Sequence, residues 1–320
     1  MRLVTFLAAA ILLTGQATAA QGWPEKSIKM LVPYSAGGPT DIQARALADD
    51  MGRTLGQTVV VENIPGATGL IATRTVARAE PDGYTLLYTS LNHTVNPLLR
   101  KDAAYDPVKD FAPISLVSSS PAMLIVGLNS PYHTLPELVN AAKSESSRVS
   151  FGSSGYGGSA HLAGEMLREQ TKTHMLHVPF KGNGPAVVDV MSGEVTFMFY
   201  PFSGLPELMS GKRVRGLAVT TQERDPRFAD VPTMKELGYK DFENSHPWTG
   251  LLAPAGTPQA VIDKLAAAVK QSVDSGRLKE RGEQTGSSLH GSTPAEFTEF
   301  IIQDRDRWQK IITEGGLQQQ

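Results

Sequence analysis

The sequence predicts an α/β fold of two domains, each with a mainly parallel sheet flanked by helices, and with two crossovers of the chain between them. The 320 residues are enough for two domains of ordinary size. Short apolar runs alternate with amphipathic stretches from residue 28 onward, as in βαβ units. Breaks in this series at 118–121 and at 248–254 are the expected crossovers. We therefore expect one domain from residues 21–122 and 248–320, and the other from residues 123–247.

The first 20 residues are expected to be a cleavable signal peptide rather than part of the fold. A positive start is followed by the apolar run 3–13 and by small residues at 17–20, with cleavage near Ala19-Ala20. The mature protein is therefore expected outside the cytoplasm. No cysteine follows the apolar run, which argues against a lipid anchor. No later stretch has the roughly 18 apolar residues that span a bilayer.

Composition excludes several classes of function. The formal net charge is −2, so no strong basic excess favours nucleic acid or an anionic membrane as a partner. The chain has no cysteine, which removes disulfides, thiolate catalysis, iron–sulfur clusters and cysteine-bound zinc. We expect no cofactor and no metal. His174 and His177 are three residues apart on a predicted strand and should point to opposite faces.

The most informative stretch is a strand, a glycine turn and a helix start. Residues 28–32 form an apolar run suited to a buried strand, and Gly37 and Gly38 allow a tight turn and close approach of another molecule. Pro39 suits the first helical position, and an amphipathic helix is expected from 40 to 55. Free N–H groups at such a helix start attract anions, although most such turns are only turns.

A second unit of the same kind follows in the other predicted domain. The strand 149–154 runs into a glycine-rich turn, and Ser159 is expected to cap a helix over 160–170. If the domains face each other, two anion sites oppose one another across a cleft. That arrangement suits a small molecule with a carboxylate at each end, held by helix dipoles and neutral hydrogen bonds.

The remaining elements follow from apolar periodicity and from turn or capping residues. Strands are expected at 58–63, 85–89, 114–117, 123–128, 175–180, 195–200 and 214–220. Helices are expected at 70–78, 134–143, 185–190, 205–209, 257–273 and 293–314.

Signatures of catalysis are mostly missing. The chain has no Gly-x-Ser-x-Gly elbow, no His-Glu-x-x-His and no phosphate loop. An exported hydrolase that uses Ser153 or Ser154 with His161 remains an alternative, but no acidic partner stands at a telling spacing. His161 alone is more typical of a packed structural histidine. His93 and Asn92 follow the carboxyl end of a strand, where polar groups line the crevice of open sheets.

Several segments together resemble one family. Val32-Pro33-Tyr34-Ser35-Ala36-Gly37-Gly38, followed by Thr40-Asp41, is similar to a segment of the extracytoplasmic binding proteins of tripartite tricarboxylate transporters, the Bug or TctC type of receptor. Further similar blocks cover nearly the whole mature chain in order: 23–28, 62–67, 79–86, 105–113, 152–165, 177–182 and 253–258.

The resemblance implies a monomeric periplasmic solute-binding protein of the Venus-flytrap type II fold. Such a receptor closes on a small organic carboxylate and delivers it to a permease of one large and one small membrane subunit, without enzymatic activity. It also implies that the loops 36–41 and 153–159 contact the ligand. The expected contact residues are Ala36, Gly37, Gly38, Pro39, Thr40, Asp41, Asn92, His93, Ser153, Ser154, Gly155, Gly157, Ser159, Tyr200 and Phe202.

Three points stay open at the level of sequence. Asp41 either caps its helix or receives an amino group or a water on the ligand. Tyr200 and Phe202 either shape the pocket for an aromatic dicarboxylate such as terephthalate, or pack beneath the hinge. A sensory receptor that presents the same solute to a signalling partner is an alternative to transport.

Overall fold

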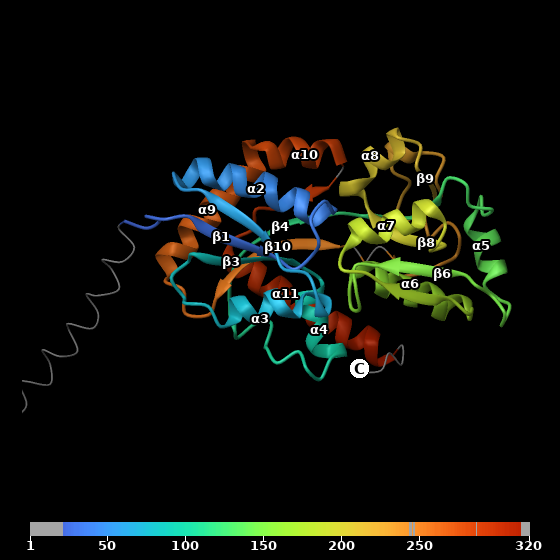
Figure 1. Ribbon diagram of the computed structural model, residues 1–320, viewed down its shortest axis with the longest axis horizontal. Helices are drawn as coiled ribbons and strands as arrows, with labels where there is room; N and C mark the ends of the chain where they lie inside the picture. Colours follow the sequence, from blue (N-terminus) through green and yellow to red (C-terminus); the bar gives the residue numbers. More distant parts are fainter. Residues whose placement is uncertain (1–21, 243–244, 246, 286, 315–320) are drawn as a thin grey trace, which may run out of the picture.

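The computed structural model describes residues 22–314, apart from residues 243, 244, 246 and 286. The expected signal peptide lies outside these residues. The chain forms two lobes, each with one sheet and flanking helices (Figure 1). We call the lobe with the six-stranded sheet domain I and the lobe with the five-stranded sheet domain II. Among the described helices, none is both long and apolar enough to cross a bilayer.

The sheet of domain I has the strand order β11-β4-β10-β3-β1-β2. Strand β1 pairs in parallel with β2 and β3, whereas β10 runs antiparallel to β3 and β4. The predicted strand at 28–32 is confirmed, and all of its residues except Lys29 are buried. The strands are β1 (Ile28–Val32), β2 (Val59–Asn63), β3 (Thr85–Ser90), β4 (Phe111–Ser119), β10 (Trp248–Pro254) and β11 (Ser288–Leu289).

The sheet of domain II has the order β7-β6-β8-β5-β9. Strand β6 pairs in parallel with β7 and β8, and β5 runs antiparallel to β8 and β9. The strands are β5 (Ala122–Gly127), β6 (Ser150–Ser153), β7 (Leu176–Pro179), β8 (Phe197–Pro201) and β9 (Val214–Val219).

The two sheets have equivalent strand orders. In each, the first strand (β1 or β6) lies between the second (β2 or β7) and the third (β3 or β8), and the next strand (β10 or β5) has arrived from the other domain. These arriving strands pair antiparallel, so the sheets are mixed, and the expected parallel pairing holds for the first three strands of each. The predicted fold class, two α/β domains with two crossovers, is confirmed. The loops after β1 and β6 therefore occupy equivalent positions at the carboxyl ends of their strands.

The helices of domain I include two that the sequence did not predict, α4 and α10. Domain I contains α2 (Pro39–Leu55), α3 (Leu70–Ala77), α4 (Asn92–Leu99), α9 (Gln259–Ser275), α10 (Arg277–Thr285) and α11 (Pro294–Glu314). Domain II contains α5 (Leu135–Ala141), α6 (Ser159–Thr171), α7 (Asn183–Ser192) and α8 (Leu205–Ser210). Three short 3-10 turns accompany them: η1 (Ala67–Gly69), η2 (Phe202–Gly204) and η3 (Pro226–Phe228).

Helix starts follow the expected capping chemistry with one exception. Thr134 forms a complete capping box with Glu137, and Thr293 exchanges hydrogen bonds with Glu296 in the same way. The prediction that Ser159 is the N-cap of α6 is wrong. The helix already begins at Ser159, Gly158 is its N-cap, and no side chain caps it. The N–H groups at this helix start are therefore left for other partners.

The two crossovers lie side by side. The chain leaves β4 through Ser120 and returns to β10 through Pro247, and the Ser120 N–H donates to the Pro247 carbonyl at 2.9 Å. Each domain has core clusters on both faces of its sheet, and one cluster of domain I also includes Leu162 of α6 in domain II. Two neighbouring crossover segments between largely separate cores are the arrangement from which hinge motion of domains is expected.

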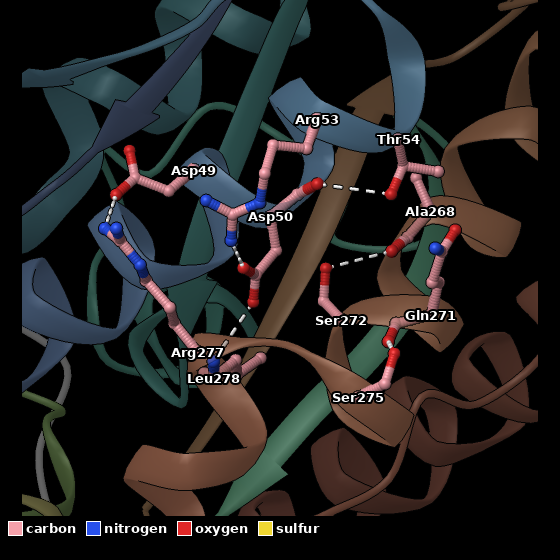
Figure 2. Close-up of polar contacts among 10 residues, drawn as sticks. All are labelled: Asp49, Asp50, Arg53, Thr54, Ala268, Gln271, Ser272, Ser275, Arg277 and Leu278. Carbon is pink, nitrogen blue, oxygen red and sulfur yellow. Dashed lines mark hydrogen bonds and ion pairs between the residues drawn. The ribbon is translucent and has the colours of Figure 1, made fainter.

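Helix α2 is held in place by the C-terminal helices (Figure 2). The buried Asp50 carboxylate accepts the Leu278 N–H at 3.1 Å, at the start of α10, and pairs with Arg53. A Cβ on Gly276 would lie 2.0 Å from an Asp50 oxygen, so only glycine allows this approach. Exposed Asp49 pairs with Arg277 at 2.7 Å. These contacts fix α2, whose first turn borders the space between the domains.

Candidate functional site

A cavity lies between the domains where the loops after β1 and β6 meet. Domain I lines it with Tyr34, Ser35, Gly38, Pro39, Thr40, Asp41, Gln43, Ser90, Ser118, Trp248 and Thr249. Domain II and the crossovers add Ser120, Ser154, Ser159, Asn183, Pro201, Ser203 and Pro247. We call this space the interdomain cavity. It lies at the carboxyl ends of the strands of both domains, where open α/β sheets bind ligands.

The lining of the interdomain cavity is polar but almost uncharged. Among the lining residues, hydroxyl and amide side chains predominate, with no lysine, arginine or histidine and one carboxylate, Asp41. Pro39, Pro201 and Pro247 provide short apolar surfaces between the polar groups. Such a lining offers many hydrogen bonds without a fixed cation.

Helix starts supply the positive potential that the side chains lack. The N-terminal ends of α2, α6 and α7 border the cavity, through Gly38 and Pro39, Ser159, and Asn183 respectively. None of the three helices has a side-chain hydrogen bond at its cap. Each helix N-terminus carries about half a positive charge together with free N–H groups. The structure thus brings together the two predicted helix starts and adds a third, that of α7.

The Asp41 carboxylate is fully engaged by its own domain. One oxygen accepts the Gly37 N–H at 2.9 Å and the Arg45 Nε at 3.1 Å, and the other accepts Asn63 Nδ2 at 2.9 Å. Burial alone would raise the pKa of Asp41, but the hydrogen bonds from Arg45, Gly37 and Asn63 outweigh it and lower the pKa. Asp41 therefore stays ionised and holds the glycine turn in shape, which agrees with the capping interpretation.

The domains are in close contact around the interdomain cavity. The Ser35 N–H donates to the Lys181 carbonyl at 2.9 Å, and Asn92 Nδ2 donates to the Tyr156 carbonyl at 2.9 Å. The cavity volume is about 30 Å³, room for roughly two waters, since one water needs about 10–15 Å³. An organic ligand therefore requires the domains to separate or the cavity to widen.

A second, wider groove adjoins the interdomain cavity and shares Ser35 and Ser154 with it. This outer groove has a volume of about 590 Å³ and carries Arg100 and Lys181 on its walls. Arg100 is paired with Asp102 at 2.9 Å, whereas the Lys181 ammonium has no partner in the described part of the chain. The outer groove thus provides a positively charged approach to an almost neutral cavity.

Six of the predicted contact residues line the interdomain cavity: Gly38, Pro39, Thr40, Asp41, Ser154 and Ser159. The others support the loops instead. Gly37 binds Asp41, Gly157 donates to His161 Nδ1 at 3.0 Å, and Ser153 is fully buried. Asn92 bridges the domains, because its Nδ2 donates to the Tyr156 carbonyl of domain II while its Oδ1 accepts the Tyr34 hydroxyl of domain I at 2.9 Å. Ala36 is not among the lining residues, and Gly155 lines the outer groove.

The structure places His93 away from the interdomain cavity. His93 lies in α4, a helix that the sequence did not predict, and its side chain turns into the core of domain I. Its Nε2 is 2.8 Å from the Pro107 carbonyl, and the ring stacks on Tyr105 and meets the edge of Phe111. Burial lowers the pKa of His93 to about 4, so it is neutral at pH 7.

Tyr200 and Phe202 are not among the cavity-lining residues, although their neighbours Pro201 and Ser203 are. Tyr200 lies on β8, where successive side chains point to opposite faces, and Phe202 is the first residue of η2. Tyr200 and Phe202 belong to the core on one face of the domain II sheet, and Phe202 packs edge-on against Phe228. Of the two interpretations, these core contacts favour packing over direct contact with a ligand.

A serine–histidine pair lies beneath the loop after β6, but not the pair expected of a hydrolase. Ser153 Oγ is 2.7 Å from His177 Nε2, and the ring of His161 packs at a tilt against that of His177, with centroids 4.1 Å apart. The buried His177 Nδ1 has no partner among the described residues, so no acidic group orients it. Burial lowers the pKa of His161 to about 3 and of His177 to about 4. These histidines are neutral supports of the loop.

Sequence reasoning missed several lining residues, notably Gln43, Ser118, Asn183, Ser203 and Thr249. Gln43 is a polar residue within the buried stripe of α2, and that anomaly could have identified it. Ser118 and Thr249 lie on β4 and β10, which pair directly although they are far apart in the chain. The sequence of neither strand indicates that the two strands pair.

Comparisons with known proteins agree with this arrangement. Residues 43–317 match the family model described as the tripartite tricarboxylate transporter family receptor, TctC. The chain belongs to this receptor family. It is 33% identical to the protein BugT of Bordetella pertussis over 299 residues, which are 93% of this chain and 91% of BugT. The predicted family is thereby confirmed.

Solved structures show the same fold. The periplasmic binding protein BugD has a TM-score of 0.89 at 36% identity, over 93% of this chain and all of BugD. MatC from Rhodopseudomonas palustris with bound malate has a TM-score of 0.84 at 31% identity, over 91% of this chain and all of MatC. A second R. palustris protein, with adipate, has a TM-score of 0.88 at 28% identity, over 93% and 100% of the chains. The chain is thus a member of a family of periplasmic solute-binding proteins.

Proposed function

We propose that this receptor captures a small organic dicarboxylate between its domains and delivers it to the membrane permease of a tripartite tricarboxylate transporter. One observation carries the proposal: three uncapped helix starts and a ring of hydroxyl groups converge on one interdomain cavity. The ligands named for two similar proteins, malate and adipate, support the same chemistry.

The charge balance favours a ligand with two carboxylates over one with three. Three helix starts supply roughly +1.5 charges, at about +0.5 each. Asp41 does not add to this balance because Arg45 neutralises it. A dianion is therefore nearly compensated on closure, whereas a trianion leaves more than one charge desolvated without compensation.

The path of the ligand follows from the two spaces between the domains. We propose that a dicarboxylate enters through the outer groove, past Lys181, and that the domains then close at the contacts of Ser35 with Lys181 and of Asn92 with Tyr156. The hinge is the crossover pair at Ser120 and Pro247, with domain I from 21–122 and 248–320 and domain II from 123–247.

Titration calorimetry with malate, adipate, terephthalate and citrate tests the proposal. We expect binding of at least one aliphatic dicarboxylate and weak or no binding of citrate. Trp248 lines the cavity, so its fluorescence reports the same event independently. Failure of all four compounds to bind would refute the dicarboxylate assignment. Terephthalate binding tighter than both aliphatic compounds would favour an aromatic dicarboxylate as the ligand.

Delivery to the permease is tested separately. We expect deletion of the gene to abolish uptake of the bound dicarboxylate, and light scattering of the purified protein to show a monomer. Unchanged uptake with a lost transcriptional response would favour the sensory alternative instead.

A further inference from the structure

Gln43 is a buried polar side chain in the stripe of α2 that faces the interdomain cavity. It lies three and four residues after Thr40 and Pro39, so the three share one helix face. Gln43 is 4% exposed and lines the cavity. A buried amide of this kind is retained only with hydrogen-bond partners, because an unpaired one costs free energy.

A chain of buried hydroxyl groups ends on the Gln43 amide. The Tyr88 hydroxyl is 2.9 Å from Thr249 Oγ1, which is 2.8 Å from Ser118 Oγ. Ser118 Oγ is in turn 3.3 Å from Gln43 Oε1. All four side chains are buried, and they come from β3, β10, β4 and α2. This series of hydrogen bonds therefore exists only when domain I is folded.

The direction of donation along this chain is fixed at its buried end. Tyr88 is fully buried, and Thr249 is the one partner of its hydroxyl among the described residues. If donation ran from Gln43 toward Tyr88, the phenolic proton would have no acceptor, which is costly at a buried site. Donation therefore runs from Tyr88 to Thr249, then to Ser118, and then to the Gln43 carbonyl oxygen. Thr249 and Ser118 each accept one proton and give one, whereas Tyr88 only gives one.

This direction leaves the Gln43 amide nitrogen as the terminal donor. Its two N–H groups have no acceptor in the described part of the chain, and the side chain borders the cavity. We propose that Gln43 is a specificity-determining residue whose N–H groups bind one carboxylate of the ligand, in an orientation set by the Tyr88–Thr249–Ser118 chain. The inference rests on the proposed function and identifies a side-chain donor for it.

The direction of donation determines which ligand groups can bind next to Gln43. An acceptor such as a carboxylate oxygen satisfies Gln43, whereas an ammonium group or another donor leaves two donors facing each other. The site thus admits a carboxylate at the end of the cavity next to α2 and rejects an amino group there. Asp41, the one acidic residue of the lining, is already engaged and offers no acceptor for such a group.

Three variants and the wild type, titrated with adipate and malate, test the inference. Gln43→Met keeps the side-chain length and removes the donors, so we expect affinity for the better probe to fall about 10- to 100-fold. Gln43→Glu places a carboxylate against a carboxylate, so the loss should exceed about 100-fold at pH 8. That loss should shrink at pH 5.5, where a buried, repelled glutamate takes up a proton and becomes a donor.

Tyr88→Phe distinguishes the directional role of the chain from simple packing. Without the phenolic donor, Thr249 can give its proton to the cavity that it lines, so donation from Gln43 toward Thr249 is no longer excluded. The amide then loses its fixed orientation, and we expect a smaller loss of about 3- to 10-fold. The thermal midpoint of each ligand-free variant is the control for folding.

The possible outcomes distinguish failure of the proposed function from failure of the role assigned to Gln43. A wild-type protein that binds neither probe overturns the proposed function, and this inference with it. A wild-type protein that binds, alongside a Gln43→Glu variant with affinity within threefold of it at pH 8, overturns the inference alone. A loss in Gln43→Glu that is the same at pH 8 and pH 5.5 also overturns it, because a merely structural role would not respond to protonation.

Discussion

Replacing Gly38 by valine should weaken ligand binding by blocking the closure of the domains. A Cβ on Gly38 would lie 3.3 Å from the Gly184 backbone nitrogen of domain II, and 3.8 Å from the Ser35 carbonyl of its own domain. The φ angle of Gly38 is −83°, which any residue adopts without backbone strain. The obstruction therefore lies mainly in the contact between the domains.

The magnitude follows from the geometry of that contact. Alanine meets Gly184 at a distance that needs only a small shift, whereas the valine methyl groups extend about 1.5 Å further from the backbone. Overpacking of this kind costs about 1–3 kcal/mol. If the closed state alone bears the cost, the affinity falls about 5- to 150-fold, with alanine well below valine.

Calorimetry with adipate or malate measures the affinity, and X-ray scattering measures the compaction on binding. Gly184→Ala is the matched control, because its Cβ would lie 3.5 Å from Gly38 N, an ordinary contact. We expect near-wild-type affinity for it and an unchanged thermal midpoint of ligand-free Gly38→Val. Wild-type affinity in Gly38→Val would refute the reasoning. A lowered midpoint of the ligand-free protein would show that the clash lies within domain I.

Three further predictions concern stability, pH and the approach of the ligand. Asp50→Ala should lower the free energy of unfolding by about 1–3 kcal/mol, because the Leu278 N–H loses its acceptor. Asp49→Ala removes only an exposed ion pair and should change the free energy of unfolding by less than about 1 kcal/mol. Urea denaturation measures both values, and equal values for the two variants would contradict this prediction. Burial lowers the pKa values of His161 to about 3 and of His177 to about 4, so the unfolded chain binds more protons below its own histidine pKa of about 6.5. The free energy of unfolding should therefore fall as the pH drops from about 6.5 to 4, with a smaller fall in His177→Gln; an identical pH profile for that variant would rule out its part in the effect. Lys181→Gln should slow association about 2- to 5-fold at low salt, measured by stopped-flow Trp248 fluorescence, and an effect on dissociation alone would contradict the role of the outer groove.

The elements that the sequence predicted well are those whose pattern is local. The apolar run of β1 and the proline, acidic residue and apolar stripe of α2 define both elements without help from the rest of the chain. Helix α4 carries Pro97 in its interior and polar residues that disfavour helix, so its packing decides its conformation. Helix α10 is strongly charged, and its start depends on Asp50, which lies on α2.

The same distinction applies to the site. The glycine turn before Pro39 and the turn before Ser159 could be identified because the residues that begin a helix are recognisable in the sequence, and a helix start attracts anions. His93, Tyr200 and Phe202 lie outside the cavity lining, because the face on which a side chain lies depends on element type and register, which residue type does not reveal. Ser118 and Thr249 are brought together in the site only by the pairing of β4 with β10.

The almost neutral lining of the interdomain cavity has a consequence for the conditions under which the receptor works. A periplasmic receptor meets the salt of the surrounding medium, and charged clamps at the surface are weakened by added ions. Once the domains close, the helix starts, hydroxyls and amides of the lining hold the ligand away from the surrounding ions, and buried interactions are screened much less than exposed ones. We therefore expect the dissociation rate to stay nearly constant between dilute and saline media. Association past the exposed Lys181 should slow as salt is added.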